Sequence, residues 1–289
     1  MGALWLRVTA ALVALWPRAV ALAWGRVLGF IAGSVLRIRR RHVDEAMRIA
    51  GVHGAAAPRM YRNLGYSLAE LFWFAGRRRD VAEHAVFREG DEAKLRALLA
   101  EGPVVFAGAH TGNWELASFR LAQEAPLAVL AKAQHWAAGN GFIDGLRASY
   151  GVQVLRSLDA AAAAVRGGRS VVLVTDQVPA RTRDGDLVPF LGRPARVDRS
   201  PAALAARLRK PLVVVAARRE GPRQIVHVLA VLEPRGAAGV VAATREATRL
   251  LGAFVLSHPE SWMWLHRRWK DAPAPAHAGS SLVVSQASR

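Results

Sequence analysis

From residue 104 onwards, short apolar runs alternate with segments of helical apolar spacing, and this alternation constrains the fold more than any other feature of the sequence. The apolar runs expected to form strands are residues 104–107, 127–131, 152–155, 170–175, 212–217 and 225–231. The segments expected to form helices are residues 114–124, 142–150, 159–166, 201–209 and 240–257. Strands that alternate with helices of this length predict an α/β fold with a mostly parallel central sheet flanked by helices.

The segments outside this alternation complete the organisation of the chain. Residues 59–73 have helical apolar spacing, and residues 91–100 predict a helix that Gly102 and Pro103 terminate. Residues 175–200 predict a long polar loop, and a loop of that length inside a compact domain is usually functional or disordered. The expected division is an N-terminal anchor at 1–41, a domain at 42–271 and a disordered tail at 272–289.

The N-terminal segment is basic and apolar at once. Residues 1–43 contain seven arginines and no acidic residue, and residues 8–36 are almost wholly apolar apart from Pro17, Arg18 and Arg26. The charge-free runs are shorter than the roughly 20 residues of a clean membrane-spanning helix. We therefore expect a membrane-embedded or in-plane anchoring helix, with the basic residues 37–41 at the lipid headgroups.

The placement of charge and tryptophan in this segment supports the anchor. On one continuous helix, four arginines share about a third of the circumference, namely Arg7, Arg18, Arg26 and Arg37. The tryptophans at positions 5, 16 and 24 suit a membrane interface. A cleaved signal peptide is the alternative, because Ala19-Val-Ala21 resembles a cleavage site, and a buried helix of a soluble protein is a second one.

The overall charge narrows the possible partners. Forty Lys and Arg residues against 22 Asp and Glu residues give a net charge of +18, which predicts an anionic partner such as a nucleic acid, a lipid surface or an acidic protein. The aromatic residues show no pattern of a base-stacking platform, so we expect no nucleic-acid partner. The absence of cysteine excludes disulfides, thiolate metal sites and a cysteine nucleophile.

His110 and Glu115 are the candidate catalytic pair, because they follow the first apolar run at the point where a strand enters a helix. The spacing allows Glu115 to orient the imidazole while His110 accepts a proton. Gly112 permits a tight turn, and amides at the helix start can stabilise an oxyanion. A purely structural alternative is a strand-end histidine followed by a helix-capping glutamate. Serine-hydrolase, Walker A and dinucleotide-binding motifs are absent, and His110 lacks a second ligand at metal spacing, so no metal is expected.

Five ordered segments together resemble one family. They are Arg62-Asn63-Leu-Gly-Tyr66-Ser-Leu-Ala-Glu70, His110-Thr-Gly-Asn113-Trp114-Glu115, Lys132 with residues 140–151, Thr175-Asp176-Gln177 with residues 188–195, and Pro259-Glu-Ser-Trp262-Met-Trp264 continuing to Lys270. They resemble the bacterial lysophospholipid acyltransferase-like family that includes the lipid A biosynthesis lauroyl and myristoyl acyltransferases and the phosphatidylinositol mannoside acyltransferases. The resemblance extends from the N-terminal segment to about Asp271.

The resemblance implies a glycerolipid acyltransferase-like fold and an O-acyltransferase of lipid A or lipopolysaccharide biosynthesis at the cytoplasmic face of the bacterial inner membrane. It would move an acyl chain from a thioester to a lipid hydroxyl, with His110 as general base oriented by Glu115. No cofactor is implied, because acyl carrier protein or coenzyme A brings the thioester as a co-substrate, and acyl carrier protein is the expected partner. The implied substrate-binding residues are Asn113, Lys132, Arg147, Arg156, Asp176, Gln177, Arg193 and Arg196.

Alternatives remain open for these residues and for the substrate. Each candidate arginine and Lys132 is also compatible with a solvated surface charge, and Asp176 either orients an active-site arginine or is an ordinary turn residue. The acceptor could instead be a phosphatidylinositol mannoside, an amino-acid lipid or a lysophospholipid. A non-catalytic basic membrane-binding protein with the same fold is the alternative from another class.

Overall fold

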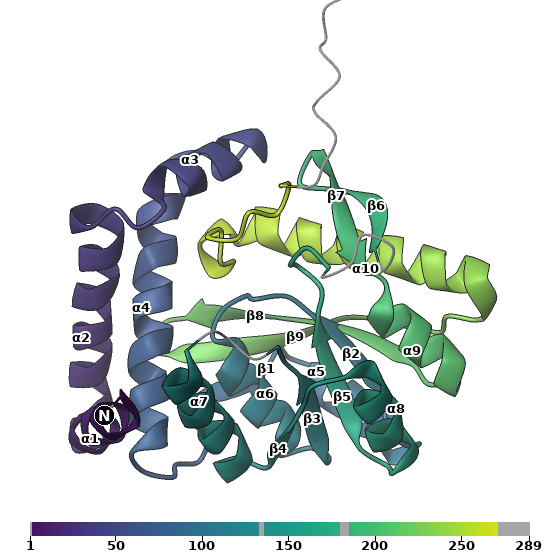
Figure 1. Cartoon of the computed structure of the whole chain (residues 1–289), viewed down its shortest axis with the longest axis horizontal. Helices are drawn as coiled ribbons and strands as arrows, with labels where there is room; N and C mark the ends of the chain where they lie inside the picture. The colour runs from purple at the N-terminus through teal and green to yellow at the C-terminus, as the bar shows by residue number, and fades with distance from the viewer. Residues whose placement is uncertain (1, 133–135, 180–184, 271–289) are drawn as a thin grey trace, which may run out of the picture.

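The computed structural model describes residues 2–132, 136–179 and 185–270, so the tail expected at 272–289 lies outside the described residues. A seven-stranded sheet forms the centre of the fold (Figure 1). Its strands, in spatial order, are β1 (Ala85–Phe87), β9 (Arg223–Leu232), β8 (Leu212–Glu220), β2 (Val105–Gly108), β5 (Ser170–Val174), β3 (Leu127–Leu130) and β4 (Val152–Leu155). All neighbouring pairs are parallel except β8 and β9, which form an antiparallel hairpin.

Helices cover both faces of this sheet. They are α5 (Asp91–Ala100), α6 (Trp114–Ala122), α7 (Ala137–Ser149), α8 (Leu158–Arg166), α9 (Ser200–Leu208) and α10 (Gly236–Ser257). Alternate residues of β2 point to opposite faces, so Phe106 packs in one core cluster with Phe119 of α6, while Val105 packs in another with α8 and α9. The α/β fold with a mostly parallel sheet, expected from the alternation in the sequence, is confirmed.

The segment 175–200 differs from the loop expected there. Its second half is a two-stranded hairpin, β6 (Gly185–Phe190) and β7 (Arg193–Asp198), whose turn residues Leu191 and Gly192 both have positive φ. Val188, Phe190, Ala195 and Val197 of the hairpin are buried, and Phe190 and Ala195 share one core cluster with residues of α10. Prolines and arginines at the intervening positions hide this alternation in the sequence, so the expectation of a loop was wrong for residues 185–198.

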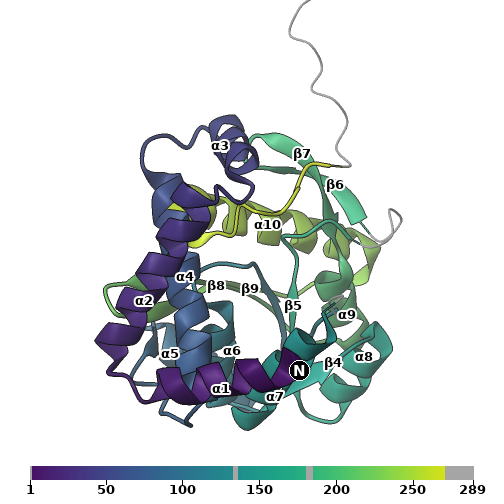
Figure 2. The same cartoon turned by 60° about the vertical axis from the view of Figure 1, so that its left-hand side comes forward.

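The N-terminal segment is divided into two helices rather than forming one continuous helix. α1 (Gly2–Ala14) is followed by α2 (Arg18–Phe30), a π-helical turn η1 (Ile31–Val35) and α3 (Arg40–Ile49). Pro17 lies at the N-cap of α2, where its missing N–H breaks no helical hydrogen bond. The two helices meet at a corner (Figure 2), so the arginines do not share the single polar face expected of one helix.

Helix α2 packs along α4 (Ala56–Ala75) at very short range. A β-carbon on Gly65 would lie 2.1 Å from the carbonyl oxygen of Gly25, and one on Gly29 would lie 2.4 Å from that of Tyr61. Only glycine permits backbones to approach this closely. The N-terminal helices are therefore packed onto the domain along much of their length.

The outward face of α1, α2 and η1 is apolar. Large exposed hydrophobic side chains along it are Leu4, Trp5, Val8, Leu12, Leu15, Val20, Val27, Phe30, Ile31 and Val35. Residues 18–35 are long and apolar enough to cross a membrane by length and composition, with 22% of that window buried in the fold. A contiguous exposed apolar face of this kind marks an interaction surface.

Candidate active site

The carboxyl ends of β2 and β5 bring His110 and Asp176 together. The two strands are adjacent and parallel, with Gly108 opposite Val174, so each polar side chain follows its strand by two residues. His110 Nδ1 lies 2.8 Å from Asp176 Oδ1, and the backbone N–H of His110 donates to Asp176 Oδ2 at 3.0 Å. This edge of an α/β sheet is the usual place for an active site.

The charge of Asp176 favours a protonated His110. Burial lowers the pKa of His110, but the charge and the hydrogen bond of Asp176 outweigh it and raise that pKa above its usual value. Burial in turn raises the pKa of Asp176, but His110 and a 2.7 Å hydrogen bond from Trp262 Nε1 outweigh it, so this pKa lies below its usual range. Asp176 therefore remains ionised and stabilises the imidazolium that forms when His110 accepts a proton.

The other ring nitrogen of His110 lies beside two polar side chains. Because Asp176 accepts only hydrogen bonds when ionised, Nδ1 carries the proton and the lone pair lies on Nε2. Gln177 Nε2 lies 3.5 Å from His110 Nε2 and 2.9 Å from His266 Nε2. Burial lowers the pKa of His266, and the charge of Asp176 opposes this without reversing it, so a neutral ring accepting from Gln177 is favoured.

Glu115 is paired with Arg147 rather than with His110, which corrects the role expected from the spacing. Arg147 Nε donates to Glu115 Oε2 at 2.9 Å and its Nη2 donates to Oε1 at 2.5 Å, a bidentate pair between α6 and α7. Burial lowers the pKa of Arg147, but Glu115 and Asp144 outweigh it and raise that pKa. Glu115 lies in the first turn of α6 and forms no hydrogen bond with His110, whose Nδ1 is paired with Asp176, so Glu115 acts on His110 through its charge.

The tight turn between His110 and α6 is fixed by hydrogen bonds to distant segments. Gly112 has a φ of 56°, and a β-carbon there would lie 2.7 Å from Gln224 Oε1, so the position requires glycine. The Gly112 N–H donates to the carbonyl of Ser261 at 2.7 Å, and the Asn113 N–H donates to Gln224 Oε1 at 3.1 Å. The Gly112 and Asn113 amides are therefore already bonded within the protein and not available to an oxyanion, and the expectation of an oxyanion at the helix start is left to the first amides of α6.

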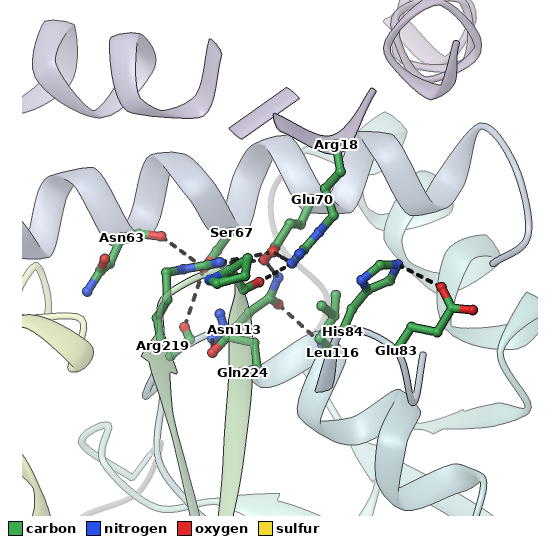
Figure 3. A network of polar contacts seen from close by, with 12 residues as sticks. Arg18, Asn63, Ser67, Glu70, Glu83, His84, Asn113, Leu116, Arg219 and Gln224 are labelled. Carbon is green, nitrogen blue, oxygen red and sulfur yellow. Dashed lines mark hydrogen bonds and ion pairs between the residues drawn. The ribbon is translucent and has the colours of Figure 1, made fainter. Parts of the chain in front are cut away.

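Asn113 connects this turn to a buried carboxylate. Its Oδ1 caps α6 by accepting from the N–H of Leu116 at 3.2 Å, and its Nδ2 donates to Glu70 Oε2 at 2.9 Å. Glu70, which is 1% exposed, also accepts from Arg219 of β8 and from Arg18 of α2 (Figure 3). Burial raises the pKa of Glu70, but Arg219, Asn113 and Arg18 outweigh it and lower that pKa. One carboxylate thus joins an N-terminal helix, the sheet and the catalytic turn.

A cavity of about 580 Å³ opens beside His110. One part of its wall is apolar and the other is charged. The apolar side chains are Leu121, Val129, Leu130, Ile143, Leu158, Val172, Leu173, Val174, Val178, Val215 and Val226. The expected site residues that line it are His110, Glu115, Lys132, Arg147, Arg156 and Gln177. Among the described residues, no group of three or more His, Asp and Glu side chains could hold a metal ion.

The other expected site residues do not line this cavity. Asn113 is buried and its side chain is bonded to Glu70. Asp176 is bonded to Nδ1 of His110, rather than orienting an arginine. Arg193 and Arg196 lie on β7, where Arg196 Nη1 is 3.5 Å from the carbonyl oxygen of Gly185. Their separation from the cavity follows from the hairpin that the sequence did not predict.

Two residues of the closing segment belong to the site although they were not expected to. Trp262 donates to Asp176, and His266 contacts Gln177, with its ring centroid 5.2 Å from that of His110. The antiparallel bridge between Thr111 and Trp262 brings this segment to the catalytic turn. The polar tip of a buried tryptophan requires a hydrogen-bond partner, which was the available signal in the sequence.

The comparisons with known proteins identify the family. No curated protein matches the chain significantly. The model of the family described as bacterial lipid A biosynthesis acyltransferase matches residues 2–271, which is nearly the whole chain and includes every strand and helix described above. The match covers the catalytic turn, the cavity and the N-terminal helices alike. The chain therefore belongs to the bacterial lipid A biosynthesis acyltransferase family.

Proposed function

We propose that this acyltransferase moves a fatty acyl chain from a thioester to a hydroxyl of a lipid A precursor, with His110 as the general base. The observation that carries the proposal is the 2.8 Å pair between His110 Nδ1 and Asp176, which leaves the lone pair of Nε2 for the acceptor. A hydroxyl is a poor nucleophile at neutral pH and requires a positioned base. Nε2 removes the hydroxyl proton while the oxygen attacks the thioester carbonyl.

The same proton then completes the reaction. Attack forms a tetrahedral intermediate with a negative oxygen, and collapse of this intermediate breaks the carbon–sulfur bond. The imidazolium of His110 returns the proton to the leaving thiolate, so the products are an ester and a thiol. Gln177, whose amide nitrogen lies 3.5 Å from His110 Nε2, is positioned to donate to the reacting oxygen. No acyl-enzyme is needed.

The charged wall of the cavity suits a phosphate-bearing substrate. Arg147 is held by Glu115, and Arg156 donates to the carbonyl of Ala131 at 2.8 Å and to Asp144. We propose that Arg156 and Lys132 contact phosphates of the donor or the acceptor, since guanidinium and ammonium groups bind them well. We propose that Glu115 keeps Arg147 in place along the cavity wall and adds to the negative field at His110.

The apolar wall suits the acyl chain of the donor. The apolar side chains listed above come from β3, β5, β8, β9 and the helices α6, α7 and α8, and they line the same cavity as His110. A thioester bond at the boundary of the polar and apolar walls would lie beside His110 while its chain is shielded from water. Acyl carrier protein or coenzyme A would supply this thioester as a co-substrate, and no further cofactor is required.

We propose that residues 1–41 attach the acyltransferase domain, residues 42–271, to the cytoplasmic face of the bacterial inner membrane. The exposed apolar face of α1 and α2 would insert into the lipid while the opposite face remains packed on α4. A helix packed along its length against a domain cannot cross the bilayer alone, which favours an anchor in the membrane plane.

The experiment that tests the proposed reaction is a lipid analysis of a deletion strain. Complementation with the wild-type chain should restore one acyl chain on lipid A, detected by mass spectrometry, whereas the His110→Ala variant should not. A missing acyl chain on another lipid, such as a phosphatidylinositol mannoside or lysophospholipid, would reject the proposed acceptor. Full complementation by the His110→Ala variant would reject the mechanism and favour a non-catalytic role.

A further inference from the structure

A second cavity lies on the other side of the catalytic turn. It has a volume of about 530 Å³, shares no lining residue with the cavity beside His110, and is bounded by α4, the tip of the β8–β9 hairpin and the segment after α10. Its lining residues are Arg59, Arg62, Asn63, Tyr66, Arg219, Gly221 and Glu260. We propose that this cavity binds a phosphate group carried by a membrane lipid.

The sequence of α4 places cationic and polar groups on one side of that helix. Arg62 and Asn63 follow Arg59 by three and four residues, and Tyr66 follows them by four and three, so the four side chains lie on one side of the helix. Arg219 reaches toward α4 from the end of β8 (Figure 3). Three guanidinium groups therefore line one cavity with a single carboxylate, Glu260. Arg219 is paired with Glu70, so Arg59 and Arg62 supply the positive charge that favours an anion.

Two of these guanidinium groups have unused buried donors. The Nε atoms of Arg62 and Arg219 are both buried and without a hydrogen-bond acceptor, although Arg219 is otherwise paired with Glu70. Within the part of the chain that the structure describes, the side chains of Arg59 and Arg62 form no hydrogen bond or ion pair. A phosphate presents several acceptor oxygens and matches the planar fork of arginine, so it would satisfy these donors.

The polar neighbours leave room for the remainder of a headgroup. Asn63 Nδ2 donates to the backbone carbonyl of Glu260 at 3.0 Å, which fixes the side chain at the cavity wall. The guanidinium carbon of Arg219 lies over the Tyr66 ring, 5.1 Å from the ring centroid. The hydroxyl of Tyr66 can reach a sugar or glycerol oxygen of a bound headgroup. The cavity is larger than a phosphate alone requires, so it can also receive the group to which the phosphate is attached.

The location of the cavity explains why the phosphate would belong to a lipid. Gly221 lies at the tip of the β8–β9 hairpin, and Arg18 at the start of α2 donates to the carbonyl of the next residue, Pro222. The cavity is thus adjacent to the helix pair with the exposed apolar face. Two sources fit this chemistry, namely a phosphate of the glycolipid acceptor and the headgroup of an anionic phospholipid.

The test compares variants in a binding assay that does not depend on turnover. The Arg59→Gln/Arg62→Gln double variant removes two charges from the cavity, and Arg166→Gln/Arg245→Gln removes two exposed charges from α8 and α10 as the matched control. Binding is measured by flotation with phosphatidylcholine vesicles, either alone or containing phosphatidylglycerol, the phosphorylated lipid A precursor or its dephosphorylated form. Thermal unfolding verifies that each variant is folded.

The assay separates the two sources. A site for the acceptor phosphate predicts that the cavity variant loses about tenfold or more in affinity for precursor vesicles, with no loss on the dephosphorylated lipid. A headgroup site predicts the same loss on phosphatidylglycerol vesicles instead. Binding equal to that of the control on every vesicle would overturn the proposal. If the double variant does not fold, the charge reversal Arg59→Glu at an exposed position provides the same comparison.

The proposed phosphate site depends on the proposed function only where it is tested by enzyme kinetics. For an active enzyme, an acceptor-phosphate site predicts that the cavity variant raises KM for the phosphorylated precursor by about tenfold or more while kcat changes little. A wild-type protein that binds precursor vesicles through this cavity but transfers no acyl chain would contradict the proposed reaction alone. Failure of the cavity and failure of the reaction are therefore distinguishable.

Discussion

Asp176 determines the protonation of His110, and this pairing leads to a pH prediction. Because the pKa of His110 is raised, the base form is lost, and the rate falls, as the pH decreases through that raised value. The Asp176→Asn variant removes the charge, so we expect the acidic limb of the kcat/KM profile to move to lower pH. We also expect the rate at neutral pH to fall by about 10²-fold or more. An unchanged acidic limb would show that another group sets it.

His110 itself should be indispensable for the reaction. The His110→Ala variant lacks the imidazole that accepts the hydroxyl proton, so acyl transfer should fall to background while the thermal unfolding temperature changes little. The measurement is product formation from a radiolabelled acyl donor.

The Glu115→Gln variant leaves Arg147 without its bidentate partner. We expect its rate of acyl transfer, measured in the same way, to fall by on the order of a hundredfold. Turnover near that of the wild type in either variant would contradict its assigned role.

Glu70 offers a stability prediction that is separate from catalysis. The Glu70→Gln variant would leave Arg219 buried without its ionic partner, so we expect a loss of about 3–5 kcal/mol in the free energy of unfolding. The matched control is Glu83→Gln, whose side chain is 71% exposed and whose loss should be negligible. Since the pKa of Glu70 is lowered by folding, its stabilising effect is present above its unfolded pKa and is lost as the pH falls through the folded value. Equal unfolding curves for the two variants would contradict this account.

Part of the site could be predicted from the sequence because it is local. His110 and Glu115 stand five residues apart at the end of an apolar run, so the position of the site at a strand end was apparent. Asp176 is separated from His110 by 66 residues, and only the adjacency of β2 and β5 makes it the partner of the imidazole. The sequence pattern gives the strands but not their order, so the correct carboxylate could not be chosen.

Among the secondary-structure elements, α1 and α2 lead to a prediction about membrane attachment. Val27 and Phe30 are 53% and 61% exposed on the outward face, so charging them in Val27→Glu/Phe30→Glu should leave the packing on α4 intact. We expect this variant to leave the membrane fraction, whereas high salt should release little of the wild-type protein, because apolar insertion is not screened. Leu256→Glu on α10 is the control. Complete release of the wild-type protein by salt would contradict an apolar anchor.

Strands and helices could be predicted from the sequence where apolar runs or helical apolar spacing were clear. The six apolar runs became β2, β3, β4, β5, β8 and β9, and the helix expected at 91–100 has these bounds in the structure. The hairpin of β6 and β7 was missed, because its alternate polar positions carry prolines and arginines that resemble a loop. The bend at Pro17 was also missed, since apolar periodicity continues on both sides of it.

The charge of the whole molecule bears on the acyl donor. A net charge of +18 is large enough to attract a protein-sized acidic partner, so we expect acyl carrier protein to be the preferred donor. With matched acyl chains, the carrier thioester should give a higher kcat/KM than the coenzyme A thioester, and this advantage should decrease steeply with ionic strength. Charge reversal at Arg193 and Arg196 on the β6–β7 hairpin should reduce it further. Equal use of both donors without salt dependence would reject the carrier.

The close contact between α2 and α4 has a consequence for where the enzyme can work. Because backbone atoms alone separate Gly25 from Gly65, the proposed anchor would be a rigid extension of the acyltransferase domain rather than a tether of adjustable length. The distance from the acyl-chain boundary of the bilayer to His110 is then a constant of the fold. With the N-terminal helices in the membrane as proposed, this fixed distance would decide which hydroxyls of a lipid reach His110, and a larger residue at position 65 would disturb the packing that fixes it.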